Sequence, residues 1–318
     1  EIEGLTAVLT QTDACDQHQL ADNVAEITAI LKGFDTYGEV TFTTDPDEYG
    51  KYWAIRSGIF PTVGGMRKPG TTCLIEDVAF HIEDLPEAVK DLSELLERHG
   101  YDDSCIYGHA LEGNFHFIVN QSFSTDSEAA RYKAMMEDVV ELVVKKYDGS
   151  LKAEHGTGRN MAPYVEYEWG TKAFEVMKRL KKILDPQGIL NPGVIFNDDP
   201  ECCFKNFKAL PLLSAGEDAT EDMHEAYARL NKCIECGFCE VNCVSCGLTL
   251  SSRTRIALQR EIAHLASTGS DPQRLSALRK QYDYYGEQTC AGDGLCSMSC
   301  PMGINVADMT HEIRRQKR

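Results

Sequence analysis

Two groups of cysteines near the C-terminal end carry the clearest chemistry of this 318-residue chain. The first group has the spacing C-x2-C-x2-C-x3-C and consists of Cys233, Cys236, Cys239 and Cys243. The second group repeats the frame with a carboxylate in the second place: Cys290, Asp293, Cys296 and Cys300. Three thiolates spaced in this way can surround one corner of a cuboidal iron–sulfur cluster. The two frames therefore predict two iron–sulfur clusters.

The spacing also predicts that the frames exchange ligands, because the fourth cysteine of such a run binds the other cluster. We expect one [4Fe–4S] cluster to be held by Cys233, Cys236, Cys239 and Cys300. The second cluster would take Cys243, Cys290 and Cys296. Its fourth ligand stays open between Asp293, Cys246 and no ligand, and the last case would give a [3Fe–4S] cluster.

Structural zinc is the alternative for these thiolates. A zinc ribbon uses two separate C-x2-C pairs, so the repeated three-cysteine frame favours iron. The odd total of 13 cysteines fits a cytoplasmic metal site better than a secreted disulfide framework. The five cysteines before residue 233 are expected to be ordinary thiols: Cys15, Cys73, Cys105, Cys202 and Cys203.

Two short polar segments in the first two hundred residues offer a second kind of chemistry. Residues 108–116 contain His109 and His116, and Glu154 and His155 open the segment 154–159. Imidazole and carboxylate groups suit a divalent metal such as zinc or manganese, and an imidazole also serves as a general base. A single histidine is more often a core residue, but the two segments together predict a metal or acid–base site.

Periodicity predicts the elements that must position these residues. We expect strands at 5–11, 39–43, 74–82, 104–107 and 114–120, and helices at 18–31, 48–56, 86–99 and 127–146. This pattern predicts an α+β fold with helices on one side of a mainly antiparallel sheet. Between the cysteine groups, apolar residues at three- and four-residue steps predict a helical hairpin over 252–266 and 272–284. The chain thus divides into an α+β domain, 1–204, and an all-α iron–sulfur domain, 205–318.

Charge and composition exclude several classes of function. Lys+Arg 32 against Asp+Glu 50 gives a net charge of −18, which disfavours nucleic-acid binding. No apolar stretch approaches the roughly 20 residues of a membrane span, and no nicotinamide or P-loop glycine motif is present. The basic run 314–318 is compatible with peripheral contact at the inner face of a membrane, with a solvated helix end as the alternative.

Three segments of the chain are similar to motifs of a known family. Residues 108–116, residues 154–158 and the run from Leu190 to Gly193 resemble, in order and separation, motifs in the C-terminal domain of FAD-linked oxidases. These flavoenzymes oxidise D-2-hydroxy acids such as D-lactate, D-2-hydroxyglutarate and glycolate. The cysteine region resembles the module of bacterial iron–sulfur D-lactate dehydrogenases. The resemblance implies a fragment of a longer chain whose upstream domain binds most of the FAD.

The resemblance also implies roles for particular residues. His155 would be the active-site base, and Arg56 would hold the substrate carboxylate through two parallel hydrogen bonds. Asn114 and Asn191 would face the flavin. The divalent-metal ligands of some members correspond to His109, His116 and Glu154. The sequence departs from the usual pattern at Glu112, Val194 and Val244, where the family more often has aspartate, lysine and proline.

The expected function is a dehydrogenase of a small D-2-hydroxy acid, of the D-lactate type, that passes electrons from FAD through the clusters to a quinone or cytochrome. One rival is a non-catalytic electron-transfer or scaffold subunit. A second rival is a zinc-binding module with a degenerate ferredoxin-like core.

Overall fold

The computed structural model describes residues 6–318, which divide between residues 59 and 60 into two compact units. The first unit contains α1 (Gln17–Leu31) and α2 (Pro46–Ser57). Each helix begins at an aspartate whose side chain accepts a backbone N–H of the first turn, Asp16 for α1 and Asp45 for α2. Both helices were predicted within two residues of these bounds.

The strands predicted at 5–11 and 39–43 are not confirmed. Residue 5 lies outside the described residues, and residues 6–11 and 39–43 have no strand assignment. A strand exists only where a neighbour accepts its hydrogen bonds, and the described part of the first unit contains no sheet. Local apolar alternation was therefore misleading in these two places.

The second unit contains a three-stranded antiparallel sheet in the order β1-β3-β2. Its strands are β1 (Thr72–Ala79), β2 (Cys105–His109) and β3 (Asn114–Gln121). The register places Asp77 of β1 and Tyr107 of β2 on either side of His116 of β3. Residues opposite one another share a face of a sheet, so these three side chains belong to one face.

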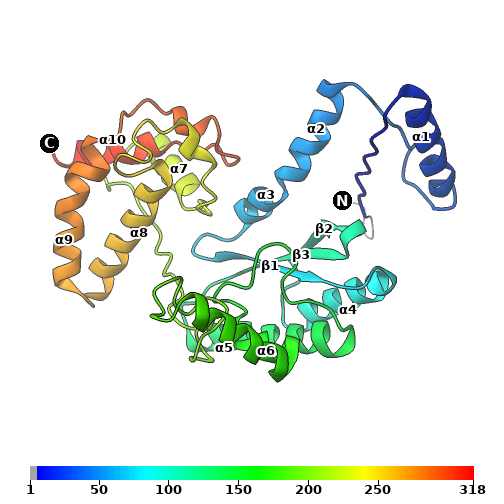
Figure 1. The fold of residues 1–318 in the computed structure, drawn as a ribbon. Helices are drawn as coiled ribbons and strands as arrows, with labels where there is room; N and C mark the ends of the chain where they lie inside the picture. The colour runs from blue at the N-terminus through cyan, green and yellow to red at the C-terminus, as the bar shows by residue number, and fades with distance from the viewer. Residues whose placement is uncertain (1–5) are drawn as a thin grey trace. The chain divides into compact units, whose positions relative to one another are not determined.

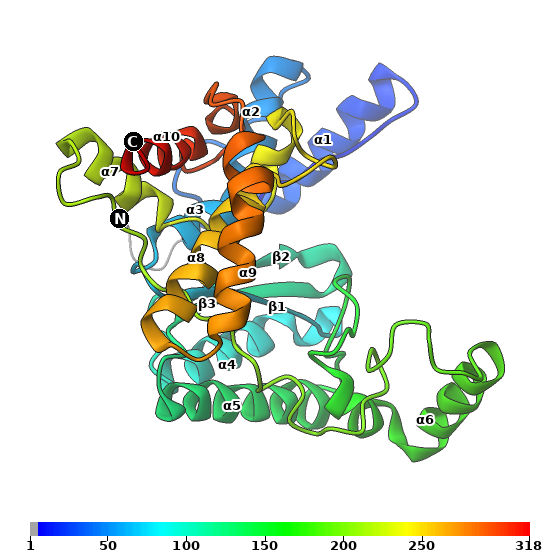
Figure 2. The same cartoon turned by 90° about the vertical axis from the view of Figure 1, so that its left-hand side faces the viewer.

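Two helices cover the other face of the sheet. They are α4 (Leu85–Arg98) and α5 (Asp126–Val140), and Figure 1 and Figure 2 both show them on the same side of the strands. The core between them includes Val78, Phe117 and Val119 from the strands, with Leu92 and Met135 from the helices. The α+β architecture with helices on one side is therefore confirmed.

Several helical segments of this unit differ from the sequence prediction or were not predicted. A π-helical turn, Glu141–Lys146, continues α5. The helices α3 (Ile59–Met66) and α6 (Val165–Leu184) were not predicted. In α6 the chain bends at Gly170, whose φ of 76° is outside the helical range. Glycine adopts such a backbone readily, which explains the break.

The cysteine region is helical, as predicted. It contains α7 (Glu221–Leu230), α8 (Ser252–Thr268), α9 (Pro272–Tyr282) and α10 (Val306–Gln316), drawn from yellow to red in Figure 1. A separate apolar core forms between them, with Leu230, Ile256 and Met309 among its members. The described residues after 204 contain no strand. The domain boundary at 204/205 remains a prediction.

None of the described helices combines the length and the apolar character needed to cross a membrane.

Candidate functional site

A fully buried carboxylate, Asp77, organises the face of the sheet that is not covered by α4 and α5. Its Oδ2 accepts backbone N–H groups from Ala153, Glu154 and His155 at 2.9, 2.8 and 2.9 Å. Its Oδ1 accepts a hydrogen bond from the amide of Asn114 at 2.6 Å. A carboxylate that accepts several N–H groups fixes their backbone strongly. Asp77 therefore determines where Glu154 and His155 lie.

The neighbouring Glu76 holds the same loop from the other face of the sheet. Its carboxylate accepts hydrogen bonds from Asn160 at 2.8 and 3.0 Å and from Lys152 at 2.8 Å. The hydroxyl of Tyr132 on α5 also donates to it, at 3.2 Å. Adjacent strand residues point to opposite faces, so Glu76 holds both ends of the loop 152–160 from one side and Asp77 holds the backbone of 153–155 from the other.

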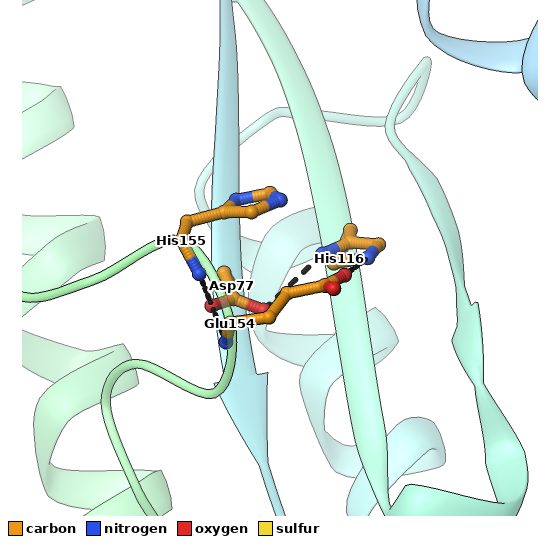
Figure 3. A group of neighbouring side chains, drawn as sticks. All are labelled: Asp77, His116, Glu154 and His155. Carbon is orange, nitrogen blue, oxygen red and sulfur yellow. Dashed lines mark hydrogen bonds and ion pairs between the residues drawn. The ribbon is translucent and has the colours of Figure 1, made fainter.

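The loop brings a carboxylate between two imidazoles. Oε1 of Glu154 lies 2.9 Å from Nε2 of His116 and 3.1 Å from Nε2 of His109. The ring of His155 stacks on that of His116, with centroids 4.7 Å apart and planes 4° from parallel. Figure 3 shows Glu154 reaching toward His116 while His155 lies over it. The two segments predicted to form one site do meet.

These side chains can serve as ligands of a divalent metal. One potential ligand atom from each of Asp77, His116, Glu154 and His155 lies within 4.8 Å of the others. The nitrogen and carboxylate oxygen donors suit zinc or another first-row metal. Buried Nδ1 of His116 makes no hydrogen bond and lies 3.2 Å from Oδ1 of Asp77. The donor set fits a metal, and the predicted set with His109 remains a prediction.

Asp77 is a site residue that sequence reasoning missed. Burial by itself would raise its pKa, but the contact with His116 and the hydrogen bonds from the His155 backbone, Asn114 and the Glu154 backbone hold that pKa well below its usual range. The group is therefore ionised at neutral pH. The signal in the sequence was a pair of acids, Glu76 and Asp77, inside an otherwise apolar strand.

The third motif, the run from Leu190 to Gly193, contacts the histidine loop through hydrogen bonds. Arg159 donates to the carbonyl of Pro192 at 2.9 Å, and the N–H of Ile195 donates to the carbonyl of Gly158 at 2.9 Å. Asn191 occupies a turn with a positive φ of 44°. Arg56 lies on α2 in the first unit, whereas the histidine loop belongs to the second.

The cysteines gather around two separate pockets. The first is lined by apolar side chains such as Ile256 and by four cysteines: Cys233, Cys236, Cys239 and Cys300. The second is lined by Arg255, Ser245 and Ser252 and by the second ligand set: Cys243, Cys290, Asp293 and Cys296. The sets predicted from ligand exchange thus each lie around one pocket. Their donors fit iron–sulfur clusters.

The two loops that enter these pockets share one backbone shape. Gly237 and Gly294 follow the second position of each frame, with φ of 89° and 74°. Each begins a short 3-10 turn, Phe238–Asn242 in the first loop and Leu295–Ser297 in the second. Asp293 therefore occupies the place that Cys236 has in the first loop.

Cys246 is less favourably placed to be the fourth ligand. It is exposed, and it is not among the residues that line the second pocket.

The thiols differ in how readily they ionise. Burial raises the pKa of Cys233 to about 11 and also raises the pKa of Cys239 and Cys296. For Cys243, burial is outweighed by hydrogen bonds from Ser245 and the Ser252 backbone and by the charge of Arg255, so its pKa is lowered. Metal binding requires thiolates and therefore releases protons from such buried thiols.

The C-terminal basic run makes contacts inside the second unit. Arg314 donates to the carbonyls of Glu287 and Cys290 at 2.6 and 3.0 Å. Arg315 forms an ion pair with Asp218 at 2.8 Å. Arg314 thereby supports the loop around the second pocket, a role that the sequence pattern did not indicate.

Comparison with protein families decides the relationship of the chain. Residues 3–195 match the model described as FAD linked oxidases, C-terminal domain, and residues 229–304 match a 4Fe-4S dicluster domain. The chain belongs to the FAD-linked oxidase family. The matched oxidase domain contains the histidine–carboxylate site, and the dicluster match covers every position of the two cysteine frames.

Curated relatives of this FAD-linked oxidase domain have related names. The chain is 28% identical over 178 residues to glycolate oxidase subunit GlcD of Bacillus subtilis, covering 56% of this chain and 36% of that protein. It is 31% identical over 146 residues to D-2-hydroxyglutarate dehydrogenase of Stutzerimonas stutzeri, covering 45% and 30%. With the mitochondrial D-lactate dehydrogenase [cytochrome] of Arabidopsis thaliana the identity is 30% over 169 residues, covering 51% and 28%. The chain spans about a third of the length of these relatives.

Proposed function

We propose that this chain is the substrate-side and electron-exit part of an FAD-dependent D-2-hydroxyacid dehydrogenase, with D-lactate as the first substrate to test. The observation that carries the proposal is the meeting of His109, His116 and Glu154 beside His155 on one face of the sheet. The relatives are named for glycolate, D-2-hydroxyglutarate and D-lactate, which supports a small 2-hydroxy acid. The electron acceptor proposed is a quinone or a cytochrome.

His155 is the proposed base. Its backbone N–H is held by Asp77 and its ring stacks on His116, so the ring is oriented before substrate arrives. Oxidation of the hydroxy acid to the 2-oxo acid removes the hydroxyl proton and a hydride from C2, and a ring nitrogen of His155 takes the proton. Arg56 is proposed to pair with the substrate carboxylate, as the family resemblance implies.

The cofactors would be held by residues already described. FAD, when bound, would supply the hydride acceptor, a divalent metal would polarise the hydroxyl, and the iron–sulfur clusters would carry single electrons. Asn114 and Asn191 are proposed to face the flavin. His109, His116 and Glu154 would hold the metal. For the second cluster we propose Asp293 as the fourth ligand, since it lines the pocket.

A kinetic comparison tests the proposal on the full-length protein reconstituted with FAD and clusters. The substrates are D-lactate, glycolate and D-2-hydroxyglutarate, with an artificial electron acceptor. Because loss of a general base costs about a hundredfold or more, His155→Gln is expected to lower kcat by at least that factor on the preferred substrate. His18→Gln, on an exposed surface of α1, is the control.

Two results would count against this function. Turnover in the His155 variant equal to that of the control would favour the non-catalytic electron-transfer subunit. Zinc without acid-labile sulfide in anaerobically purified protein would favour the zinc-binding module.

A further inference from the structure

Three arginine side chains are buried beside the cysteine loops: Arg67, Arg255 and Arg260. Arg67 donates to backbone carbonyl oxygens, among them that of Cys233 at 2.9 Å. Arg260 donates to the same carbonyl and forms an ion pair with Glu235 at 3.2 Å. Of the three, Arg255 is the one that lines a cysteine pocket. Its surroundings therefore bear directly on what that pocket holds.

The guanidinium of Arg255 is surrounded by neutral acceptors and one sulfur. Nε donates to the carbonyl of Gly286 at 2.6 Å, and Nη2 donates to the hydroxyls of Ser245 and Thr289 at 2.9 and 3.2 Å. Nη1 lies 3.7 Å from Sγ of Cys243. These contacts fix the plane of the guanidinium with one edge toward a predicted cluster ligand.

No carboxylate in residues 6–318 forms an ion pair with Arg255, although only 1% of its surface is exposed. Buried charges in proteins are paired or lie beside a charged group, because removing a charge from water is costly. A source of balancing negative charge is the second pocket, whose lining includes Cys243, 3.7 Å from Arg255, and Asp293.

The first pocket has a different charge environment. Arg253 lines it, but this side chain is 39% exposed and forms an ion pair with Glu240 at 3.0 Å. The charge of Arg253 is therefore both screened by water and neutralised by a neighbour. Among the arginines that line the two pockets, Arg255 of the second pocket is therefore the buried one without a carboxylate partner. Arg67 is also buried, but it contacts the backbone carbonyl of Cys233 and lines neither pocket.

We propose that Arg255 tunes the second cluster: its buried positive charge stabilises the reduced form and raises the reduction potential of that cluster. The inference rests on the proposed function with two clusters. Reduction adds one electron, supplied by the chemical reductant of the titration, and so one negative charge to the group held by the second ligand set. No bond or proton needs to change. A fixed positive charge in a medium of low dielectric favours the more negative form.

The test is a potentiometric titration followed by EPR, with dithionite as reductant, on anaerobically purified full-length protein. The second cluster is assigned by the signal that is absent from a Cys296→Ala variant. In Arg255→Gln we expect the reduced-to-oxidised ratio of that cluster, at the wild-type midpoint, to fall at least tenfold, which corresponds to about 59 mV for one electron. The first cluster should keep its midpoint.

Two further variants separate charge from structure. Arg255→Lys keeps the charge and should show a smaller fall than Arg255→Gln. Arg279→Gln removes an equal charge from the exposed surface of α9 and should leave both midpoints unchanged. Iron and sulfide analysis accompanies each titration. If Arg255→Gln loses only the second cluster while Arg255→Lys retains it, the charge requirement is supported.

Other outcomes overturn the inference. Unchanged midpoints in Arg255→Gln with both clusters present would show that the charge has no effect on the potential. Equal loss of the second cluster in the glutamine and lysine variants would give the arginine a structural role only. Absence of sulfide from the wild-type protein would instead refute the proposed function.

Discussion

The histidine site and the cysteine pockets are built in different ways. The histidine site stands on paired strands, and its side chains bond to one another through Asp77 and Glu154. The cysteines lie on loops with short 3-10 turns, and buried arginines support these loops from the side. The sheet thus forms its site on folding, whereas the pockets bring together thiols that a bound cluster would link. Folding and cofactor binding should be coupled in the second region and separate in the first.

Removing the clusters should produce the largest effect, a loss of protection from proteolysis in the cysteine region. Chelation of iron under oxidising conditions is expected to make the cysteine loops, near 233–246 and 290–303, the first sites of proteolysis. The strands β1 and β3 should stay protected, because their hydrogen bonds and core do not involve the clusters. Limited proteolysis with mass spectrometry, on loaded and stripped protein, gives the measurement.

One result of the proteolysis experiment would contradict this comparison. Equal protection of the loops in stripped and loaded protein would show that the pockets, like the sheet, are formed without their cofactors.

Asp77 offers the sharpest test of the first region. Asp77→Ala leaves three backbone N–H groups of the histidine loop without their acceptor, so the free energy of unfolding should fall by about 3 kcal/mol. Chemical denaturation of the loaded protein measures it. Asp102→Asn, an exposed aspartate of the same unit, is the control and should change little.

The pH dependence gives the sign of the Asp77 contribution. Since its folded pKa lies below the unfolded value of about 3.9, its stabilisation is complete above that pH and is lost as the pH falls further. Asp77→Asn should therefore show a shallower loss of stability than the wild type below about pH 4. If the free energy of unfolding fell equally with pH in the two proteins, Asp77 would not contribute to the pH dependence.

The smallest expected effect concerns the fourth ligand of the second cluster. Asp293→Ala should convert its signal to that of a three-iron cluster, whereas Asp293→Cys should retain four irons, because the thiolate takes the place that Cys236 has in the first loop. EPR and iron analysis distinguish these results. The control Cys246→Ser should leave the cluster unchanged, and loss of the fourth iron there would identify Cys246 as the ligand.

Sequence patterns predicted the elements and ligand sets whose residues recur at regular spacing. Alternation along residues 114–120 and the two cysteine frames led to β3 and to the residues that line both pockets. Alternation failed at residues 39–43, because it reports an apolar stripe and not a pairing partner. Asp77 and Arg255 were missed for a related reason: a charged side chain is normally assigned to the surface, and only tertiary contacts show that these two are buried.

The adjacent acids of β1 have a consequence for motion. Glu76 and Asp77 together hold the backbone of Ala153, Glu154 and His155 and the side chains of Lys152 and Asn160. Swinging this loop outward would break all of these contacts at once, which makes it one of the slowest-opening segments of the unit. Hydrogen exchange at His155 should therefore be as slow as in the strands. Glu154 and His155 are exposed, so a ligand can reach these side chains without this loop opening.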